Sequence, residues 1–199
     1  EMVDGKVIEA FAKAGKVVSV GHTNGTYNEI KEKIPYGITF ATHLFNAMRP
    51  WGSREPGAVG AVLETKDMYA GLICDGVHCD FASVELAYKL KSGHICIVTD
   101  AIAPAAAPEI KEYIWAGKKI HRDGNRLIDD NGTLGGASIT MSQSVRNVVN
   151  QVGATVEEAL KMASLYPAQV MGIDDKYGKI KEGYFADLVI LDEKLIVKG

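Results

Sequence analysis

Four short, almost continuously apolar runs recur in the first hundred residues, and each ends in polar residues. They lie in the segments VVSVGHT (17–23), ITFATHL (38–44), YAGLICDGVH (69–78) and HICIVTD (94–100). Runs of this length, rich in β-branched residues, are typical of parallel strands buried on both faces. The pattern therefore predicts an α/β fold, as either a doubly wound sheet or a closed barrel.

Helical patterns alternate with these strands. Asp4 precedes an apolar stripe at helical spacing, and Gly15 stands where a helix tends to end. The polar segment 26–34 predicts a second helix, which Pro35 should stop, and 81–93 predicts a third. The segment between the second and third strands, rich in Gly and Pro, is expected to be a long loop.

The middle of the chain carries a different pattern. Residues 112–132 predict a β-excursion whose hairpin turn uses Asp123 and Gly124. The following segment GTLGGAS (132–138) is ambiguous, because its glycines could let the backbone approach a ligand or could only shape a turn. It lacks the final Lys of a phosphate-binding P-loop, so no nucleotide site is indicated.

Two helices and a short β-region complete the predicted organisation. The helices are expected over 138–153 and 156–172, the second with Thr155 as N-cap and Glu158 three residues later. From Lys176 the pattern returns to short strands. We therefore expect an α/β unit over residues 1–175 and a segment of a small β-domain over 176–199.

The composition excludes several classes of protein. The chain has 199 residues, of which 47% are hydrophobic, and its net charge of −3 offers no basic surface for nucleic acid. No apolar stretch approaches the roughly 20 residues that span a bilayer. Three cysteines without CxxC spacing favour a reducing compartment, so we expect a cytoplasmic protein. A complete eight-strand barrel takes about 250 residues, so we expect a piece of a longer protein.

Candidate catalytic residues stand at the ends of the four strands. His22, His43, His78 and Asp100 each lie at or just past the C-terminal end of one strand. In a closed barrel these ends face one mouth, whereas an open sheet would spread them along a line. Neutral imidazoles suit zinc, iron or cobalt, and a nearby carboxylate can act as the base in hydrolysis. A metal-dependent hydrolase is the prediction.

Other roles for these residues are open from the pattern. A single His at a strand end is often structural, and Asp100 could instead cap the next segment. His94 and His121 are assigned to solvent or structure. The loop NAMRPWGSREPG (46–57) contains Arg49 and Arg54, whose guanidinium groups suit phosphate or carboxylate, although an isolated loop Arg is usually only solvated.

Several motifs together carry a family resemblance. They are GHT (21–23), ATHLFNAM (41–48), REPG (54–57), DGVH (75–78), VTDA (98–101) and GTLGGAS (132–138). In this order they resemble the N-acetylglucosamine-6-phosphate deacetylases of the amidohydrolase superfamily. The resemblance covers essentially the whole chain. It implies the C-terminal half of a TIM-type (β/α)₈ barrel, followed by the C-terminal strands of a small β-sandwich domain.

The resemblance also implies roles for individual residues. His22 and His43 would be metal ligands for a divalent cation such as zinc or iron, and Asp100 the catalytic acid and base. Substrate contacts are implied for Asn46, Ala47 and Arg54 with the sugar phosphate, and for His78, Leu134, Gly135 and Gly136 with the sugar. In some relatives the arginine comes from a neighbouring subunit, which implies a homodimer.

The implied reaction hydrolyses the N-acetyl group of N-acetylglucosamine 6-phosphate to glucosamine 6-phosphate and acetate. In the family, a glutamate ligand and a further histidine lie upstream, outside this sequence. We therefore expect this chain alone to bind metal poorly and to show little activity. The alternatives are a dihydroorotase-like or deaminase-like amidohydrolase, and a non-catalytic half-barrel.

Overall fold

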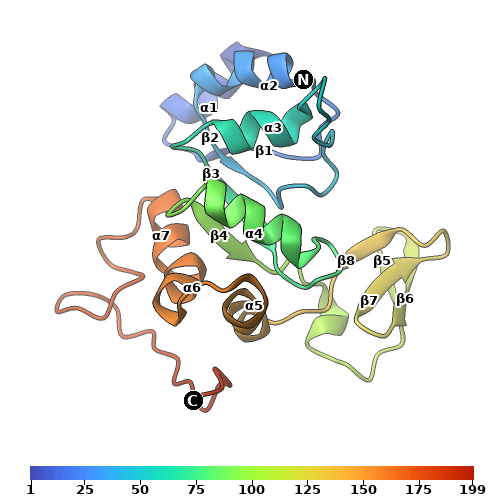
Figure 1. Cartoon of the computed structure of the whole chain (residues 1–199), viewed down its shortest axis with the longest axis vertical. Coiled ribbons are helices and arrows are strands. Elements are labelled where there is room, and N and C mark those ends of the chain that lie inside the picture. The colour runs from blue at the N-terminus through green and yellow to red at the C-terminus, as the bar shows by residue number, and fades with distance from the viewer.

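The fold is organised around a four-stranded parallel sheet. The computed structural model describes all 199 residues. Strand order in the sheet is β1-β2-β3-β4, with β1 (Val18–Val20), β2 (Ile38–Ala41), β3 (Tyr69–Ile73) and β4 (Ile95–Val98) (Figure 1). All three neighbouring pairs are parallel. Because spatial order follows chain order, successive strands add in one direction, as in half of a (β/α)₈ barrel. The predicted α/β class is confirmed.

Helices connect and cover these strands. They are α1 (Gly5–Lys13), α2 (Tyr27–Lys33), α3 (Gly57–Glu64) and α4 (Phe81–Leu90). The Asp4 carboxylate caps α1 by accepting from Lys6 N at 2.8 Å. Thr26 and Glu29 form a reciprocal capping box at the start of α2. Pro35 follows in a 3₁₀ turn, so α2 ends where the sequence predicts.

Helix α3 corrects the expectation of a loop between β2 and β3. Its first seven residues, 57–63, are all buried. A helix buried on every side has no polar face, so its sequence shows no 3.6-residue period. Gly57 and Gly60 also lower its intrinsic helix propensity. Packing against α2 and α4, rather than local preference, forms this helix.

The predicted β-excursion is an antiparallel sheet that lies beside the main body in Figure 1. It consists of β5 (Glu112–Trp115), β6 (Lys118–Asp123), β7 (Arg126–Asp129) and β8 (Leu134–Ala137), in that order. Asp123 pairs with Arg126, so the hairpin turn is Gly124–Asn125 and the predicted turn is one residue out of place. The GTLGGAS segment supplies β8, which bridges from Ala137 to Ala101 after β4.

The helices after β8 depart from the prediction at two places. Helix α5 (Met141–Asn147) continues as a π-helix over Val148–Val152. The expected single helix after Thr155 is divided at Ser164 into α6 (Val156–Ala163) and α7 (Leu165–Met171). Pro167 explains the break, because it has no N–H to donate to the Ala163 carbonyl. The predicted Thr155 cap is confirmed, with Oγ accepting from Glu158 N at 3.1 Å.

The main core lies between the parallel sheet and its helices. It contains 27 buried residues, among them Leu72 on β3, Val62 on α3 and Met162 on α6. Burial of these side chains supplies the hydrophobic free energy that holds the sheet and helices together. All three cysteines are buried and unpaired. None of the helices combines the length and apolar character needed to cross a bilayer.

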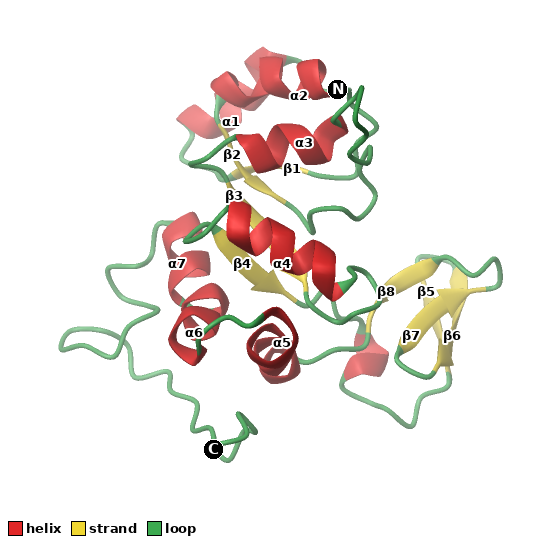
Figure 2. Cartoon of the chain, in the orientation of Figure 1, coloured by secondary structure: helices red, strands yellow, loops and turns green.

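The C-terminal segment contradicts the prediction of short strands. After α7 the chain is loop, apart from one bridge between Leu191 and Val197 (Figure 2). Its apolar side chains remain exposed, with Ile180 at 92% and Ile190 at 66%. A strand needs a neighbour that pairs with its backbone, and the rest of this chain supplies none here. The proposed domain boundary at residues 175 and 176 stays a prediction.

Candidate active site

The three residues with predicted metal-binding or catalytic roles have strained backbones. His22, His43 and Asp100 are each the second residue after the last residue of a parallel strand. Their φ angles are +44°, +31° and +51°. A residue with a Cβ in this left-handed region costs about 1–3 kcal/mol, and such strain gathers at functional sites. The fold therefore holds these three positions in a conformation that local preference opposes.

His22 and His43 meet face to edge. Their Nε2 atoms are 2.9 Å apart and their ring planes cross at 67°. The His43 side chain is buried, and its Nδ1 has no hydrogen-bond partner. The Nε2 pair can share one proton as a hydrogen bond, or both lone pairs can face a cation. The structure thus brings together the two predicted metal ligands.

The geometry of this pair fits two ligands of one cation. Two nitrogens about 2.1 Å from a metal, at an angle between about 90° and 110°, lie roughly 3.0–3.4 Å apart. The observed 2.9 Å is close to this range. No group of three His, Cys, Asp or Glu side chains in the chain could hold a metal ion. Two ligands fall short of the four of a typical site, so a cation between these rings would need further ligands from elsewhere.

Asp100 is separate from the histidine pair. Its side chain is exposed and makes no hydrogen bond or ion pair, while its carbonyl accepts from Ala137 N at 2.8 Å. The alternative that Asp100 caps the next segment is wrong, because the 3₁₀ turn Ala103–Ala105 has Ile102 at its N-cap and no side-chain cap. Asp100 presents an unpaired carboxylate just past the C-terminal end of β4.

The loop after β2 lies against the loop after β1. Thr23 N donates to the Ala47 carbonyl at 2.9 Å, and Arg49 N donates to the Thr23 carbonyl at 2.9 Å. Between the loops is an open hollow of about 390 Å³, which includes His22 and Ala47 in its lining. Two of the predicted site residues therefore border one hollow.

Asn46 and Arg54 have different surroundings within the same loop. The Asn46 side-chain amide donates to the Leu44 carbonyl and to Cys79 Sγ, both at 3.4 Å. Arg54 is exposed and makes no ion pair or side-chain hydrogen bond. Asn46 is thus fixed between the loops after β2 and β3, whereas Arg54 points to a surface that another molecule can reach.

The REPG motif has a structural role that the sequence did not reveal. Glu55 Oε1 accepts from Tyr27 N at 2.8 Å and from Gly57 N at 2.9 Å. These two hydrogen bonds hold the pKa of Glu55 below its usual value. Gly57 has φ of +63°, and a Cβ there would lie 2.5 Å from the Pro50 carbonyl oxygen. Glu55 and Gly57 therefore fix the loop that contains Asn46 and Ala47.

His78 is held by Asp75, a residue that we did not predict. His78 Nδ1 lies 2.7 Å from Asp75 Oδ2, and the two side chains are only 6% and 7% exposed. Burial alone would raise the pKa of Asp75, but hydrogen bonds from His78 and the backbone N–H of Val77 outweigh it, so the pKa is lowered. The D-x-x-H spacing in the DGVH motif was the available signal.

Packing accounts for the two adjacent glycines of GTLGGAS, Gly135 and Gly136. A Cβ on Gly135 would lie 2.5 Å from the Ile120 side chain, and Gly136 has φ of +117° with Ile102 close by. Both positions therefore need glycine for the fold itself. Contact of Leu134, Gly135 and Gly136 with a sugar stays a prediction. Their strand lies beside the residues that follow Asp100, which is compatible with that role.

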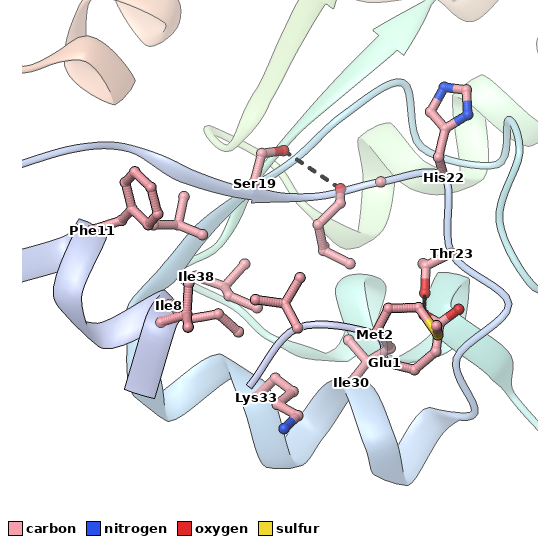
Figure 3. Close-up of a pocket in the computed structure, with 15 residues that line it drawn as sticks. Glu1, Met2, Ile8, Phe11, Ser19, His22, Thr23, Ile30, Lys33 and Ile38 are labelled. Carbon is pink, nitrogen blue, oxygen red and sulfur yellow. Dashed lines mark hydrogen bonds between the residues drawn. The ribbon is translucent and has the colours of Figure 1, made fainter. Parts of the chain in front are cut away.

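A second cavity lies along the edge strand β1. It has a volume of about 370 Å³ and is lined mainly by apolar side chains, including Ile8, Phe11 and Ile38 (Figure 3). The His22 ring points away from these side chains. Strand β1 has one neighbour in the sheet, so this cavity is a feature of the sheet edge. The strand-end residues and the 390 Å³ hollow form the better candidate site.

The amidohydrolase family model matches residues 3–198. The chain belongs to the amidohydrolase family. Within that family, this amidohydrolase is 47% identical over 191 residues to an N-acetylglucosamine-6-phosphate deacetylase of Haemophilus influenzae. The match covers 95% of this chain and 50% of the relative.

The chain is also similar to solved deacetylase structures. The amidohydrolase matches an N-acetylglucosamine-6-phosphate deacetylase of Pasteurella multocida with a TM-score of 0.94 and 43% identity, over 97% of this chain and 51% of that one. It also matches a mutant deacetylase of Mycobacterium smegmatis whose structure contains N-acetyl-D-glucosamine-6-phosphate. The TM-score is 0.89 and the identity 32%, over 97% of this chain and 51% of that one. The chain spans about half the length of these relatives.

Proposed function

We propose that this amidohydrolase chain provides half of an N-acetylglucosamine-6-phosphate deacetylase, which hydrolyses its substrate to glucosamine 6-phosphate and acetate. The observation that carries the proposal is the convergence of His22 and His43, whose Nε2 atoms are 2.9 Å apart. Similarity to deacetylases over 95% of the chain supports the choice of substrate. The protein is expected to act in the cytoplasm.

His22 and His43 would hold a divalent cation, zinc, iron or a similar metal, through their Nε2 atoms. Such a cation supplies Lewis acidity, which polarises a carbonyl and makes water a better nucleophile at neutral pH. Because the chain offers only two grouped ligands, further ligands must come from residues outside this pair. This chain by itself is therefore expected to bind the cation weakly.

Asp100 would move the proton. Its free carboxylate takes a proton from the water that attacks the acetyl carbonyl carbon, so that a C–O bond forms. The C–N bond then breaks, and Asp100 returns the proton to the leaving amine nitrogen. One residue acts first as base and then as acid. The exposed position of Asp100, without a competing hydrogen bond, leaves its oxygens available for this role.

The remaining proposed contacts recognise the substrate. Asn46, Ala47 and Arg54 would bind the sugar phosphate, while His78, Leu134, Gly135 and Gly136 would contact the sugar. The exposed Arg54 guanidinium matches a carboxylate or phosphate geometrically, and it can do so across an interface with a second subunit. A homodimer is part of the proposal.

A fusion protein tests the reaction. The first half of the Haemophilus influenzae deacetylase, joined to residues 1–199, should release acetate from N-acetylglucosamine 6-phosphate. Unphosphorylated N-acetylglucosamine should react far more slowly, and residues 1–199 alone should show little turnover. Asp100→Asn should abolish most of the activity of the fusion protein, whereas Asp175→Asn, an exposed carboxylate elsewhere, should not.

Two results would contradict the proposal. Equal rates with and without the phosphate would instead favour an amidohydrolase of the dihydroorotase or deaminase type. Full activity of the Asp100→Asn fusion protein would remove this carboxylate from the reaction.

A further inference from the structure

The turn after β3 is built around the buried Asp75 carboxylate. Oδ1 accepts from the backbone N–H groups of Val77 and His78, both at 2.8 Å, while Oδ2 faces His78 Nδ1 at 2.7 Å. The two oxygens therefore have separate tasks. One shapes the turn, and the other faces the imidazole of His78.

Asp75 determines where the proton of neutral His78 lies. An ionised carboxylate can only accept hydrogen bonds, so the 2.7 Å contact requires a proton on Nδ1. His78 Nε2 then carries a lone pair. It makes no hydrogen bond within the chain and is not among the fully buried atoms without a partner, so it reaches the surface.

A second element holds the start of this turn. Asn147, the last residue of α5, donates from Nδ2 to the Cys74 carbonyl at 2.8 Å. Cys74 directly precedes Asp75, so the peptide between them is fixed by a helix distant in sequence. The position of the Asp75 carboxylate is therefore set from both sides, by the Asn147 contact and by the backbone of its own turn.

We propose that Asp75 is a positioning residue that keeps the His78 proton on Nδ1 and presents Nε2 as a hydrogen-bond acceptor for a hydroxyl group of the bound sugar. Asp75 itself is buried and touches no substrate. The identity of the ligand rests on the proposed function, whereas the location of the proton does not. A ligand with a hydroxyl donor at this point is favoured over one that offers only acceptors.

Asp75→Asn makes the inference testable. Because the two backbone N–H groups need an acceptor, the Asn oxygen should take the place of Oδ1, and its NH₂ should then face His78 Nδ1. An NH₂ group donates, so the neutral imidazole must move its proton to Nε2. The replacement should thus convert Nε2 from an acceptor to a donor without changing the size of the side chain.

The experiment is ¹⁵N NMR of the histidine side chains in residues 1–199, at a pH where His78 is neutral. His78→Gln identifies the His78 signals among the five histidines. Wild type should show the Nδ1–H form and Asp75→Asn the Nε2–H form. Asp80→Asn is the matched control, because it makes the same carboxylate-to-amide change at the α4 cap, where Asn can still accept from Ala82 N, and it does not touch His78, so it should keep Nδ1–H.

Failure of this inference can be separated from failure of the deacetylase proposal. An Nε2–H form in the wild type would overturn the inference, as would an unchanged tautomer in a folded Asp75→Asn. If that variant does not fold, Asp75→Glu, which keeps an acceptor-only carboxylate, should retain Nδ1–H. None of these measurements needs catalysis.

The fusion protein adds a functional readout. Asp75→Asn should lower kcat/KM for N-acetylglucosamine 6-phosphate by roughly tenfold to a hundredfold, the range known for partners that orient a functional histidine. Asp75→Glu should recover part of that loss. An active fusion protein whose kcat/KM is the same with Asp75→Asn would show that the tautomer does not matter for the sugar.

Discussion

His22 Nε2 lies 2.9 Å from His43 Nε2, although the two rings come from loops after different strands. The C-terminal ends of neighbouring parallel strands lie at the same edge of the sheet. His22 and His43 can therefore be in contact although one βα unit separates them in the sequence. Both residues have backbones in the left-handed region. This relationship leads to the first prediction.

Loss of one ring should weaken metal binding. In the fusion protein, His43→Gln removes one of the two proposed nitrogen ligands, and we expect the affinity for Zn²⁺ or Co²⁺ to fall at least about tenfold. Metal content after dialysis, measured by elemental analysis, checks this. His94→Gln serves as the control, because that ring packs on Tyr69 at the N-terminal ends of β3 and β4, whereas His22 and His43 follow the C-terminal ends of their strands. Unchanged metal content in His43→Gln would exclude the pair as ligands.

The core should respond as a tightly packed interior. Leu72 on β3 is fully buried, and Leu72→Ala should lower the free energy of unfolding by about 2–5 kcal/mol. Leu90→Ala, at a leucine that is 56% exposed, should cost less than about 0.5 kcal/mol. Urea denaturation of both variants gives the comparison. Equal losses of unfolding free energy in the two variants would mean that the core between the sheet and its helices is not packed as described.

Lys91 should make stability depend on alkaline pH. Its side chain is 2% exposed, and Nζ donates to the Thr65 carbonyl at 2.7 Å. Burial lowers the pKa of Lys91 to about 8 from its ordinary 10.5, and Asp67 opposes part of that shift.

Between these two pH values the unfolded chain binds more protons at this site than the folded chain, so the Lys91 contribution to stability rises with pH. Urea denaturation from pH 7 to 10.5 should show this rise as a difference between wild type and Lys91→Met. Parallel pH curves for the two proteins would contradict the assignment.

The cysteines should be unreactive until the chain unfolds. Burial raises the pKa of Cys79 to about 11 and that of Cys96 to about 12, and it also raises the pKa of Cys74. Because the thiolate is the reactive form, a thiol reagent at neutral pH should label none of the three in the folded chain. In denaturant it should label all three. Rapid labelling of Cys79 without denaturant would show that the loop after β3 opens readily.

The elements that the sequence predicted well have a local signal. The four parallel strands are continuous apolar runs, and Asp4 and Thr155 cap their helices with side-chain oxygens next to helical stripes. The meeting of His22 and His43 followed from strand order, because both residues stand at strand ends. Local pattern and tertiary structure agree at these places.

The errors have tertiary causes. Helix α3 is buried on every side, so no periodicity marks it, and the break at Ser164 depends on the N–H that Pro167 lacks. The strands expected after Lys176 need partners that this chain does not provide. Asp75 was missed because its role depends on burial beside His78, which spacing alone does not show.

The π-helix at Val148–Val152 has a consequence for how insertions and deletions would act here. A π turn holds one residue more than an α turn within the same single revolution, whereas each residue of a regular α-helix turns the axis by about 100°. Deleting one residue from this turn would therefore leave a regular α turn and keep Asn147 directed at the Cys74 carbonyl, whereas a deletion from a regular α turn would rotate one side of the helix against the other by that angle. The irregular turn is thus a place where the chain can lose one residue while α5 keeps its orientation.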